Sequence, residues 1–303
     1  MFHHFHRHGE PSAQGSITAE SFATILDKLS DHHNLLTAEK WMQRALSASL
    51  AADEICLTFD DALQCQYEIA APIMQARGLT GFFFVYSSVF EGQLENLELY
   101  RRLRTDHFET IDAFYQAFEE IFTARFPELA AAPKLLAFKP ADYLKPFEFY
   151  SDSDRRFRFI RDEILGVNRY VDVMDTLIKQ KGLTKSQLAK NLWMTNAQLQ
   201  NLSAAGHIIG LHSYSHPTRL CALSHSEQQA EYQKNFDHLS RVLGKHPTTM
   251  SHPCNAYDSG TLDILQGLGI KLGFCSNMVA LDTRSMLEFP RRDHADVMKA
   301  IAA

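Results

Sequence analysis

The sequence has no hydrophobic run that approaches the roughly 20 residues needed for a transmembrane helix. Its longest run, residues 82–85 (Phe-Phe-Phe-Val), is typical of a buried strand. The N-terminus also lacks a basic segment followed by an apolar one, so we expect no signal peptide. These absences predict a protein without a transmembrane segment, located in the cytoplasm.

Cysteine is scarce and is not arranged in pairs. The 303 residues include five cysteines, an odd number, and none of them forms a C-x-x-C motif. Buried or incidental thiols in a reducing compartment are the ordinary interpretation of this pattern, which agrees with a cytoplasmic location. The cysteines are Cys56, Cys65, Cys221, Cys254 and Cys275.

The chain also lacks an excess of basic charge. Its formal net charge is −6, whereas a general nucleic-acid-binding protein needs a basic surface. Hydrophobic residues make up 45% of the sequence, which is enough for a core without a disulfide or a structural metal. The length suits one large α/β domain or two ordinary ones.

The first part of the chain alternates strands and helices. We expect a strand over residues 2–6, helices over 18–29 and 37–46, a buried strand over 55–59, a helix over 63–77 and a strand over 81–86. Strands joined through helices by short connections predict a parallel sheet.

Residues 92–194 interrupt this alternation with helical patterns alone. Apolar and aromatic residues recur there at helical spacing, and we expect the aromatic ones to form a core between helices. Alternation then resumes with helices over 196–205, 224–243 and 259–267 and strands over 207–211, 248–253, 272–275 and 287–290. The predicted organisation is a first part over 1–91, an inserted helical subdomain over 92–194 and a second part over 195–303.

Two segments carry the candidate chemistry. Asp60 and Asp61 end one predicted strand, and His212 and His216 follow another. In parallel α/β folds, functional groups collect at the carboxyl ends of strands. One carboxylate and two imidazoles suit Zn²⁺, with Co²⁺, Ni²⁺, Mn²⁺ or Fe²⁺ as alternatives, and leave a coordination position open for water.

The two aspartates are expected to have separate roles. Neighbouring side chains on a strand point to opposite faces, so both can serve one site only where the strand ends. We assign Asp61 to the metal and Asp60 to the general base. Each part taken alone has a simpler interpretation: an Asp pair often forms a turn and helix cap, and two histidines four residues apart occur by chance.

At this point the residues resemble a known family. Thr58-Phe59-Asp60-Asp61 resembles the first motif of the polysaccharide deacetylases (NodB homology, carbohydrate esterase family 4), and His212-Ser213-Tyr214-Ser215-His216-Pro217 resembles the second. The resemblance covers roughly residues 1–90 and 195–303. It implies an α/β fold, a distorted (β/α) barrel, with a divalent metal, and hydrolysis of an N-acyl group on an amino sugar. It also implies a base at the first aspartate and a ligand at the second.

Several positions depart from the family pattern. Ala62 stands where a glycine is usual, and residues 250–257 lack the usual arginine. Arg291 is the expected substitute that orients Asp60. The backbone N–H of Cys254 is expected to stabilise the oxyanion. His294 or His252 is the expected proton donor, because the family's later Leu-x-His element has no clear match.

The simpler alternatives for these residues remain open. Arg291 and His294 are equally consistent with a solvated charge cluster, and His252 with a packing residue. The histidines at positions 3, 4, 6 and 8 fit a metal-scavenging tract or an exposed tail. Strand alternation would place His4 and His6 on one face, and we expect His4 to line the site.

The expected function is metal-dependent removal of an acetyl or formyl group from an amino sugar. The expected substrate is a nucleotide- or lipid-linked precursor in surface polysaccharide or lipopolysaccharide biosynthesis. One alternative is a metal amidase acting on a non-sugar amide such as a ureide or imide. Another is a carbohydrate-binding protein that keeps the fold after losing catalytic residues.

Overall fold

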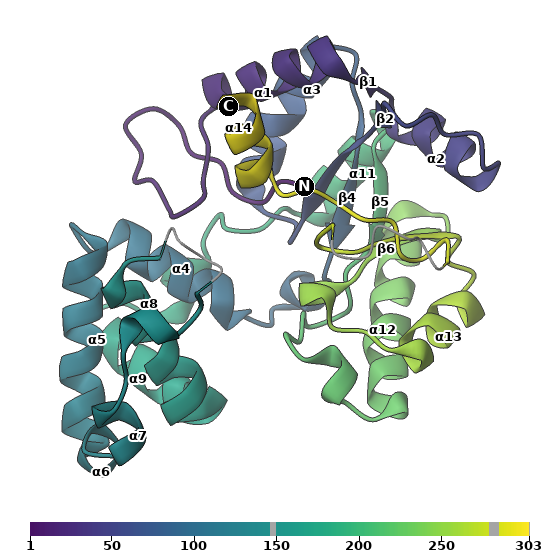
Figure 1. Cartoon of the computed structure of the whole chain (residues 1–303). Coiled ribbons are helices and arrows are strands. Elements are labelled where there is room, and N and C mark those ends of the chain that lie inside the picture. Colours follow the sequence, from purple (N-terminus) through teal and green to yellow (C-terminus); the bar gives the residue numbers. More distant parts are fainter. Residues whose placement is uncertain (146–149, 279–284, 303) are drawn as a thin grey trace. The chain divides into compact units, whose positions relative to one another are not determined.

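The computed structural model describes residues 1–145, 150–278 and 285–302, and it contains two compact units. Unit 1 comprises residues 1–95 and 191–303, and unit 2 comprises residues 96–190 (Figure 1). The division of the chain into domains at residues 91 and 194 stays a prediction of the sequence.

Unit 1 is built on a five-stranded parallel sheet, and the strands follow one another in the order β3-β4-β5-β6-β7. The sheet curls into a half-barrel, and its parallel strands with helices around them confirm the expected α/β fold (Figure 1). Every residue of β3 and β4 is buried, as the uninterrupted hydrophobic run at residues 82–85 predicts. The strands are β3 (Leu57–Asp60), β4 (Gly81–Val85), β5 (Ile208–Leu211), β6 (Thr249–Ser251) and β7 (Leu272–Phe274).

The two edges of the sheet are extended by single bridges where the sequence predicted full strands. Phe2 pairs with Phe59, and Phe289 pairs with Phe274. The expected strand over 2–6 is wrong because Phe2 and Phe5, three residues apart, are both buried, which a strand of period two does not allow. The expected strand over 287–290 ends at once because Pro290 has no N–H to donate to the sheet.

Helices flank this sheet, and α11 and α12 pack against β5 (Figure 1). The expected helix over 63–77 is present as a continuous helical segment over residues 64–76, which contains a wide turn at residues 66–70, and Leu63 just before it forms a bridge with Trp193. Among the residues described, no helix is both long and apolar enough to span a membrane. The helices of unit 1 are α1 (Ala19–His32), α2 (Ala38–Leu46), α3 (Ala71–Ala76), α11 (Asn196–Ala204), α12 (His225–Leu243), α13 (Ser259–Gly267) and α14 (His294–Ala302), and two short strands, β1 (Asn34–Leu35) and β2 (Glu54–Ile55), pair separately.

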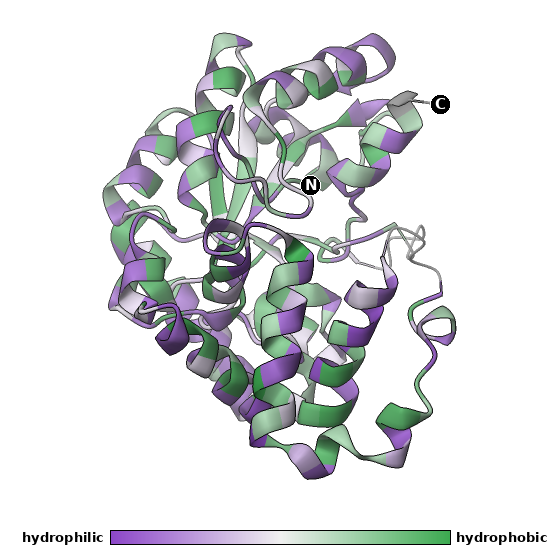
Figure 2. Ribbon diagram, turned by 90° about the vertical axis from the view of Figure 1, so that its left-hand side faces the viewer, coloured by the Kyte–Doolittle hydropathy of each residue, from purple (hydrophilic) through white to green (hydrophobic). Residues whose placement is uncertain are grey.

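Unit 2 is helical, as its sequence pattern predicts. Phe114, Phe118 and Phe157 are fully or almost fully buried, and the ring of Phe157 lies 5.3 Å from that of Phe114 and 4.9 Å from that of Phe118. The aromatic stripe is therefore a core between helices. Figure 2 shows hydrophilic and hydrophobic residues side by side along the helices, as amphipathic helices require. The helices are α4 (Asn96–Asp106), α5 (Ile111–Arg125), α6 (Pro127–Ala130), α7 (Pro133–Leu136), α8 (Asp152–Phe159), α9 (Gly166–Gln180) and α10 (Lys185–Ala189).

Candidate active site

The backbone turns sharply after Asp60, the last residue of β3. Asp61 and Ala62 both have positive φ angles, 78° and 54°. This turn brings two neighbouring carboxylates to one side of the sheet edge, which a continuing strand would not do. The left-handed conformation favours glycine, so Ala62 occupies a backbone position where its methyl group adds strain. The glycine that is usual in the family at this position thus has a physical reason.

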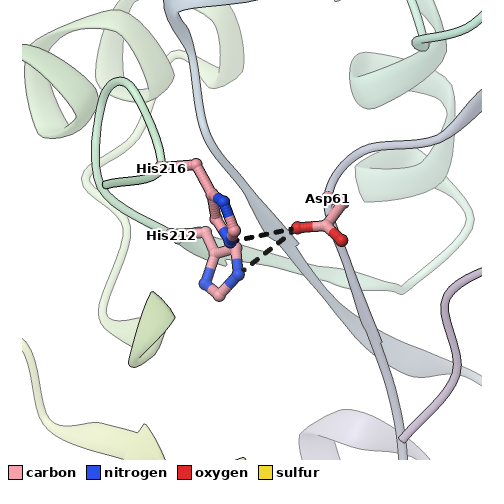
Figure 3. A group of neighbouring side chains, drawn as sticks. All are labelled: Asp61, His212 and His216. Atoms are coloured by element: carbon pink, nitrogen blue, oxygen red, sulfur yellow. Dashed lines mark ion pairs between the residues drawn. The ribbon is translucent and has the colours of Figure 1, made fainter. Parts of the chain in front are cut away.

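The two histidines lie on a loop that begins where β5 ends. Ser213 and His216 both have left-handed backbones, with φ angles of 61° and 57°. The Ser213 hydroxyl accepts a hydrogen bond from the His216 N–H at 3.1 Å. This tight loop points both imidazoles toward Asp61 (Figure 3).

Asp61, His212 and His216 form a buried cluster with the geometry of a metal site. The Asp61 Oδ1 atom lies 3.5 Å from the Nε2 atoms of both histidines, and the three candidate ligand atoms all lie within 4.8 Å of one another (Figure 3). Ligand atoms bound about 2 Å from a tetrahedral zinc ion are separated by roughly 3.3 Å. Among the described residues, Asp61 Oδ1 is buried without a hydrogen-bond donor. A cation would satisfy this oxygen, so the residues fit a divalent metal.

The hydrogen bond of His212 also selects the tautomer that a metal needs. Its Nδ1 atom lies 2.8 Å from the carbonyl oxygen of Ser251. A carbonyl oxygen can only accept, so Nδ1 carries the proton and the lone pair of Nε2 faces Asp61.

Asp60 is held by Arg291 in a buried two-pronged ion pair. Arg291 Nη1 lies 2.7 Å from Asp60 Oδ1, and Nη2 lies 2.7 Å from Oδ2. The side chains of both residues are 3% exposed. Arg291 also donates to the Ser251 hydroxyl and to the carbonyl of Cys275, which fixes the plane of its guanidinium group. Asp60 is therefore held in one orientation.

The charges of this cluster support one another. Burial alone would raise the pKa of the Asp60 carboxyl, but Arg291 and then His212 outweigh burial and lower this pKa to about 2. Burial also opposes the ionisation of Asp61, yet His216 and His212, when they are protonated in the metal-free site, hold its pKa well below its usual range. Both carboxylates are thus negatively charged at neutral pH and attract a cation.

The remaining predicted residues lie in different surroundings. Cys254 follows β6 in a left-handed turn, with a φ angle of 50°, and burial, followed by the negative charge of Asp61, raises the pKa of its thiol to about 11. His252 is fully buried, its ring stacks on Tyr257 at 3.9 Å, and its Nε2 hydrogen-bonds the carbonyl of Leu287. In the described part of the chain, His252 has no hydrogen bond or ion pair with the cluster.

His294 lies at the start of α14. Its ring stacks on Phe2 at 5.8 Å, and its Nδ1 lies 3.4 Å from Asp293. No ion pair or hydrogen bond among the described residues joins it to Asp60, Asp61 or the two imidazoles.

The structure places His3, which the sequence pattern did not single out, beside the carboxylates. The Nε2 atom of His3 lies 3.9 Å from the Oδ2 atoms of both Asp60 and Asp61, and its side chain is 25% exposed. The expectation for His4 depended on strand alternation, which this segment does not adopt. Because Phe2 and Phe5 are both buried, the side chain of His3 between them can face the site. The spacing of these two phenylalanines is the sequence feature that could have indicated this.

Comparison with known families agrees with the motifs. The model of the family described as "Polysaccharide deacetylase" matches residues 167–273. This range contains His212, His216 and the segment around Cys254, and it begins within α9 of unit 2. A search of curated protein sequences found no match.

Several solved structures share the fold at low sequence identity. The Streptococcus pyogenes deacetylase PplD in complex with acetate aligns with a TM-score of 0.56 and 17% identity, covering 96% of this chain and 88% of that one. IcaB from Ammonifex degensii aligns with a TM-score of 0.54 and 14% identity, covering 99% and 94%. A de-N-acetylase from Aggregatibacter actinomycetemcomitans aligns with a TM-score of 0.56 and 12% identity, covering 99% and 97%. The family-model match and the shared fold confirm the resemblance to the polysaccharide deacetylases and indicate that the chain is a hydrolase of this kind.

Proposed function

We propose that this protein is a metal-dependent hydrolase that removes the N-acyl group of an amino sugar. The observation that carries the proposal is the buried cluster of Asp61, His212 and His216, with Asp60 beside it in a fixed orientation. A purely structural metal site needs no second carboxylate, whereas a hydrolytic site needs a base.

Asp61, His212 and His216 would hold the ion, with zinc first among the candidates. Bound there, a divalent ion supplies Lewis-acid chemistry, because it makes water more acidic and polarises the acyl carbonyl of the substrate. The protein contributes the three ligands and the tautomer of His212.

Asp60 accepts the proton of the attacking water. Its lowered pKa keeps Asp60 ionised at physiological pH, which a proton acceptor requires. Arg291 holds both of its oxygens and thereby fixes the direction of proton transfer. The carbonyl oxygen becomes negatively charged during attack, and the N–H of Cys254 is our candidate donor to it.

The departing nitrogen needs a proton, and we propose His3 as the donor. His3 lies beside both aspartates and is partly exposed, so it is accessible to a bound substrate. His252 is fully buried, and His294 has its contacts elsewhere, so both are weaker candidates than His3. The products are a carboxylic acid and a free amine.

The substrate class follows from the family match and from the names of the structural neighbours. These include a deacetylase with acetate bound and a de-N-acetylase, which favour an acetyl group over formyl. A nucleotide- or lipid-linked precursor of a surface polysaccharide or lipopolysaccharide, and a cytoplasmic location, stay predictions of the sequence.

The deciding experiment identifies by mass spectrometry the products (acetate, formate, free amine or ring-opened amide) that are formed by protein stripped of metal and reloaded with Zn²⁺ or Co²⁺. The panel contains N-acetylglucosamine oligomers, nucleotide-linked N-acetyl sugars, their N-formyl counterparts, and non-sugar ureides and imides. We expect release only from N-acyl sugars and only with metal. Turnover of the ureides or imides alone would favour the amidase, and sugar binding without any release would favour a carbohydrate-binding protein.

Variants of the two aspartates test the separate roles. Asp60→Asn should keep the bound metal and lose at least 100-fold in rate, within the range of about 10²–10⁴ that a general base contributes. Asp61→Asn should lose both metal and activity. Asp263→Asn, at an exposed position on α13, is the matched control and should behave as the wild type. A rate near that of the wild type in Asp60→Asn would show that the assigned base is wrong.

A further inference from the structure

The loop that carries both metal-binding histidines makes two backbone hydrogen bonds to the segment that ends β4 and follows it: the His212 N–H donates to the Val85 carbonyl at 3.1 Å, and the Ser88 N–H donates to the Tyr214 carbonyl at 2.9 Å. Residues 212–216 follow β5 and include two left-handed residues, Ser213 and His216. A loop with this backbone is strained and keeps its shape only when its surroundings impose it. Two side chains of α12, which packs against β5, add further hydrogen bonds to the loop backbone.

Asn235 on α12 hydrogen-bonds the beginning of the loop. Its Oδ1 atom accepts a hydrogen bond from the His212 N–H at 3.1 Å, and its Nδ2 atom donates to the carbonyl of Val85 at 3.0 Å. The side chain is fully buried. One amide thus connects the first metal ligand to the end of β4 and leaves neither of its own polar atoms unpaired.

Glu231, one helical turn before Asn235, hydrogen-bonds the middle of the same loop. Its Oε2 atom accepts from the N–H groups of Tyr214 and Ser215, at 3.0 and 2.8 Å. Its Oε1 atom accepts from the Ser215 hydroxyl at 2.8 Å. Three donors therefore converge on one carboxylate, and hydrogen bonds to an ionised acceptor are about twice as strong as neutral ones.

Glu231 and Asn235 lie four residues apart, so they face the loop from the same side of α12. Together they bind the N–H groups of His212, Tyr214 and Ser215, three of the five residues between the two ligands inclusive. Neither side chain belongs to the ligand set or to the motifs of the sequence.

We propose that Glu231 and Asn235 are positioning residues that preorganise His212 and His216 for the metal ion. They touch neither the ion nor the substrate, and they act by holding the backbone from which both imidazoles project. This inference rests on the proposed function, because it assumes that the cluster binds a divalent metal. Residues that orient metal ligands typically change metal affinity by roughly 10–100-fold when they are removed.

Variants of Glu231 give the sharpest test, because this side chain is only partly buried. Glu231→Ala removes all three acceptors, and we expect the dissociation constant for Zn²⁺ or Co²⁺ to rise roughly 10–100-fold. Glu231→Gln should restore most of the affinity, since its amide oxygen can accept from both N–H groups and its amide nitrogen can donate to the Ser215 hydroxyl. Asn235→Ala should resemble Glu231→Ala, and Gln229→Ala, at an exposed position on α12, is the matched control.

The measurements are the dissociation constant from competition with a coloured chelator, the visible spectrum of the Co²⁺ protein, and thermal unfolding of the metal-free protein. A positioning role predicts weaker binding and an altered Co²⁺ spectrum in Glu231→Ala while the metal-free protein remains folded. Wild-type affinity and spectrum in a folded Glu231→Ala would overturn the inference and leave the proposed function intact. A wild-type protein that binds neither ion would instead overturn the proposed function and, with it, this inference.

Discussion

Replacement of Arg291 by methionine tests how the buried charges of the site are balanced. Methionine keeps most of the volume of the side chain but removes the five donors that arginine presents to Asp60 and its neighbours. In the wild type, both oxygens of Asp60 are bound by Arg291 at 2.7 Å, and the pair is 3% exposed. The variant leaves Asp60 as a buried carboxylate without its cation.

The size of the effect follows from the pKa of Asp60. Its fall from 3.8 to about 2 corresponds to net stabilisation on the order of 2 kcal/mol. Because the folded pKa lies below the unfolded one, this contribution is complete above pH 3.8 and is lost as the pH falls toward 2. The net value already includes the cost of burial, which Arg291→Met leaves uncompensated. We therefore expect a loss of about 3–5 kcal/mol, as for other broken buried pairs.

Urea unfolding of the metal-free protein at pH 7 measures this loss, and the pH dependence of kcat/KM measures the effect on the base. Without Arg291, burial raises the pKa of Asp60, so the acid limb of the profile should move to higher pH. Arg291→Lys should fall between the two, because lysine keeps the charge but not the planar fork. Arg292→Met, at the exposed neighbouring position, is the control. A loss below about 1 kcal/mol together with an unchanged acid limb would refute this account of the site.

Three further predictions concern other parts of unit 1. His207 is buried, and burial lowers its pKa to about 4, so its contribution to stability is complete above pH 6.5 and falls by about 2 kcal/mol between pH 7 and pH 5. His207→Asn keeps an acceptor for the Gly81 N–H and should make the urea unfolding midpoint less dependent on pH between pH 7 and pH 5. A midpoint that depends on pH as strongly as in the wild type would contradict the prediction. Gly210→Ala would place a methyl carbon 2.5 Å from Thr249 Oγ1 and 2.7 Å from the Thr249 carbonyl oxygen, and should lower the unfolding free energy by about 1–3 kcal/mol, whereas Gly267→Ala, with open space around it, should not. His3→Gln should lower kcat about tenfold or more while the metal content stays at the wild-type level; loss of the ion would instead make His3 a ligand.

The sequence by itself determined the chemistry of the site and the type of sheet. A parallel sheet follows from strands that alternate with helices, and its carboxyl ends necessarily lie at one edge. Local patterns therefore predicted that the strand ends would carry Asp61, His212 and His216. The helix over 259–267 was predicted with the bounds that the structure gives, since Asp258 supplies a clear cap.

Tertiary structure decided which distant side chains complete the site. The pairing of Arg291 with Asp60, expected from the sequence, forms across 231 positions because the curled sheet brings the segment after β7 toward β3. His3 faces the aspartates in a segment where Phe2 and Phe5 are both buried, an arrangement that strand alternation does not predict. Glu231 and Asn235 support the histidine loop because α12 packs beside β5. Local sequence patterns determine which functional side chains a segment carries. Packing and the curl of the sheet determine which of these side chains, from distant segments, come into contact.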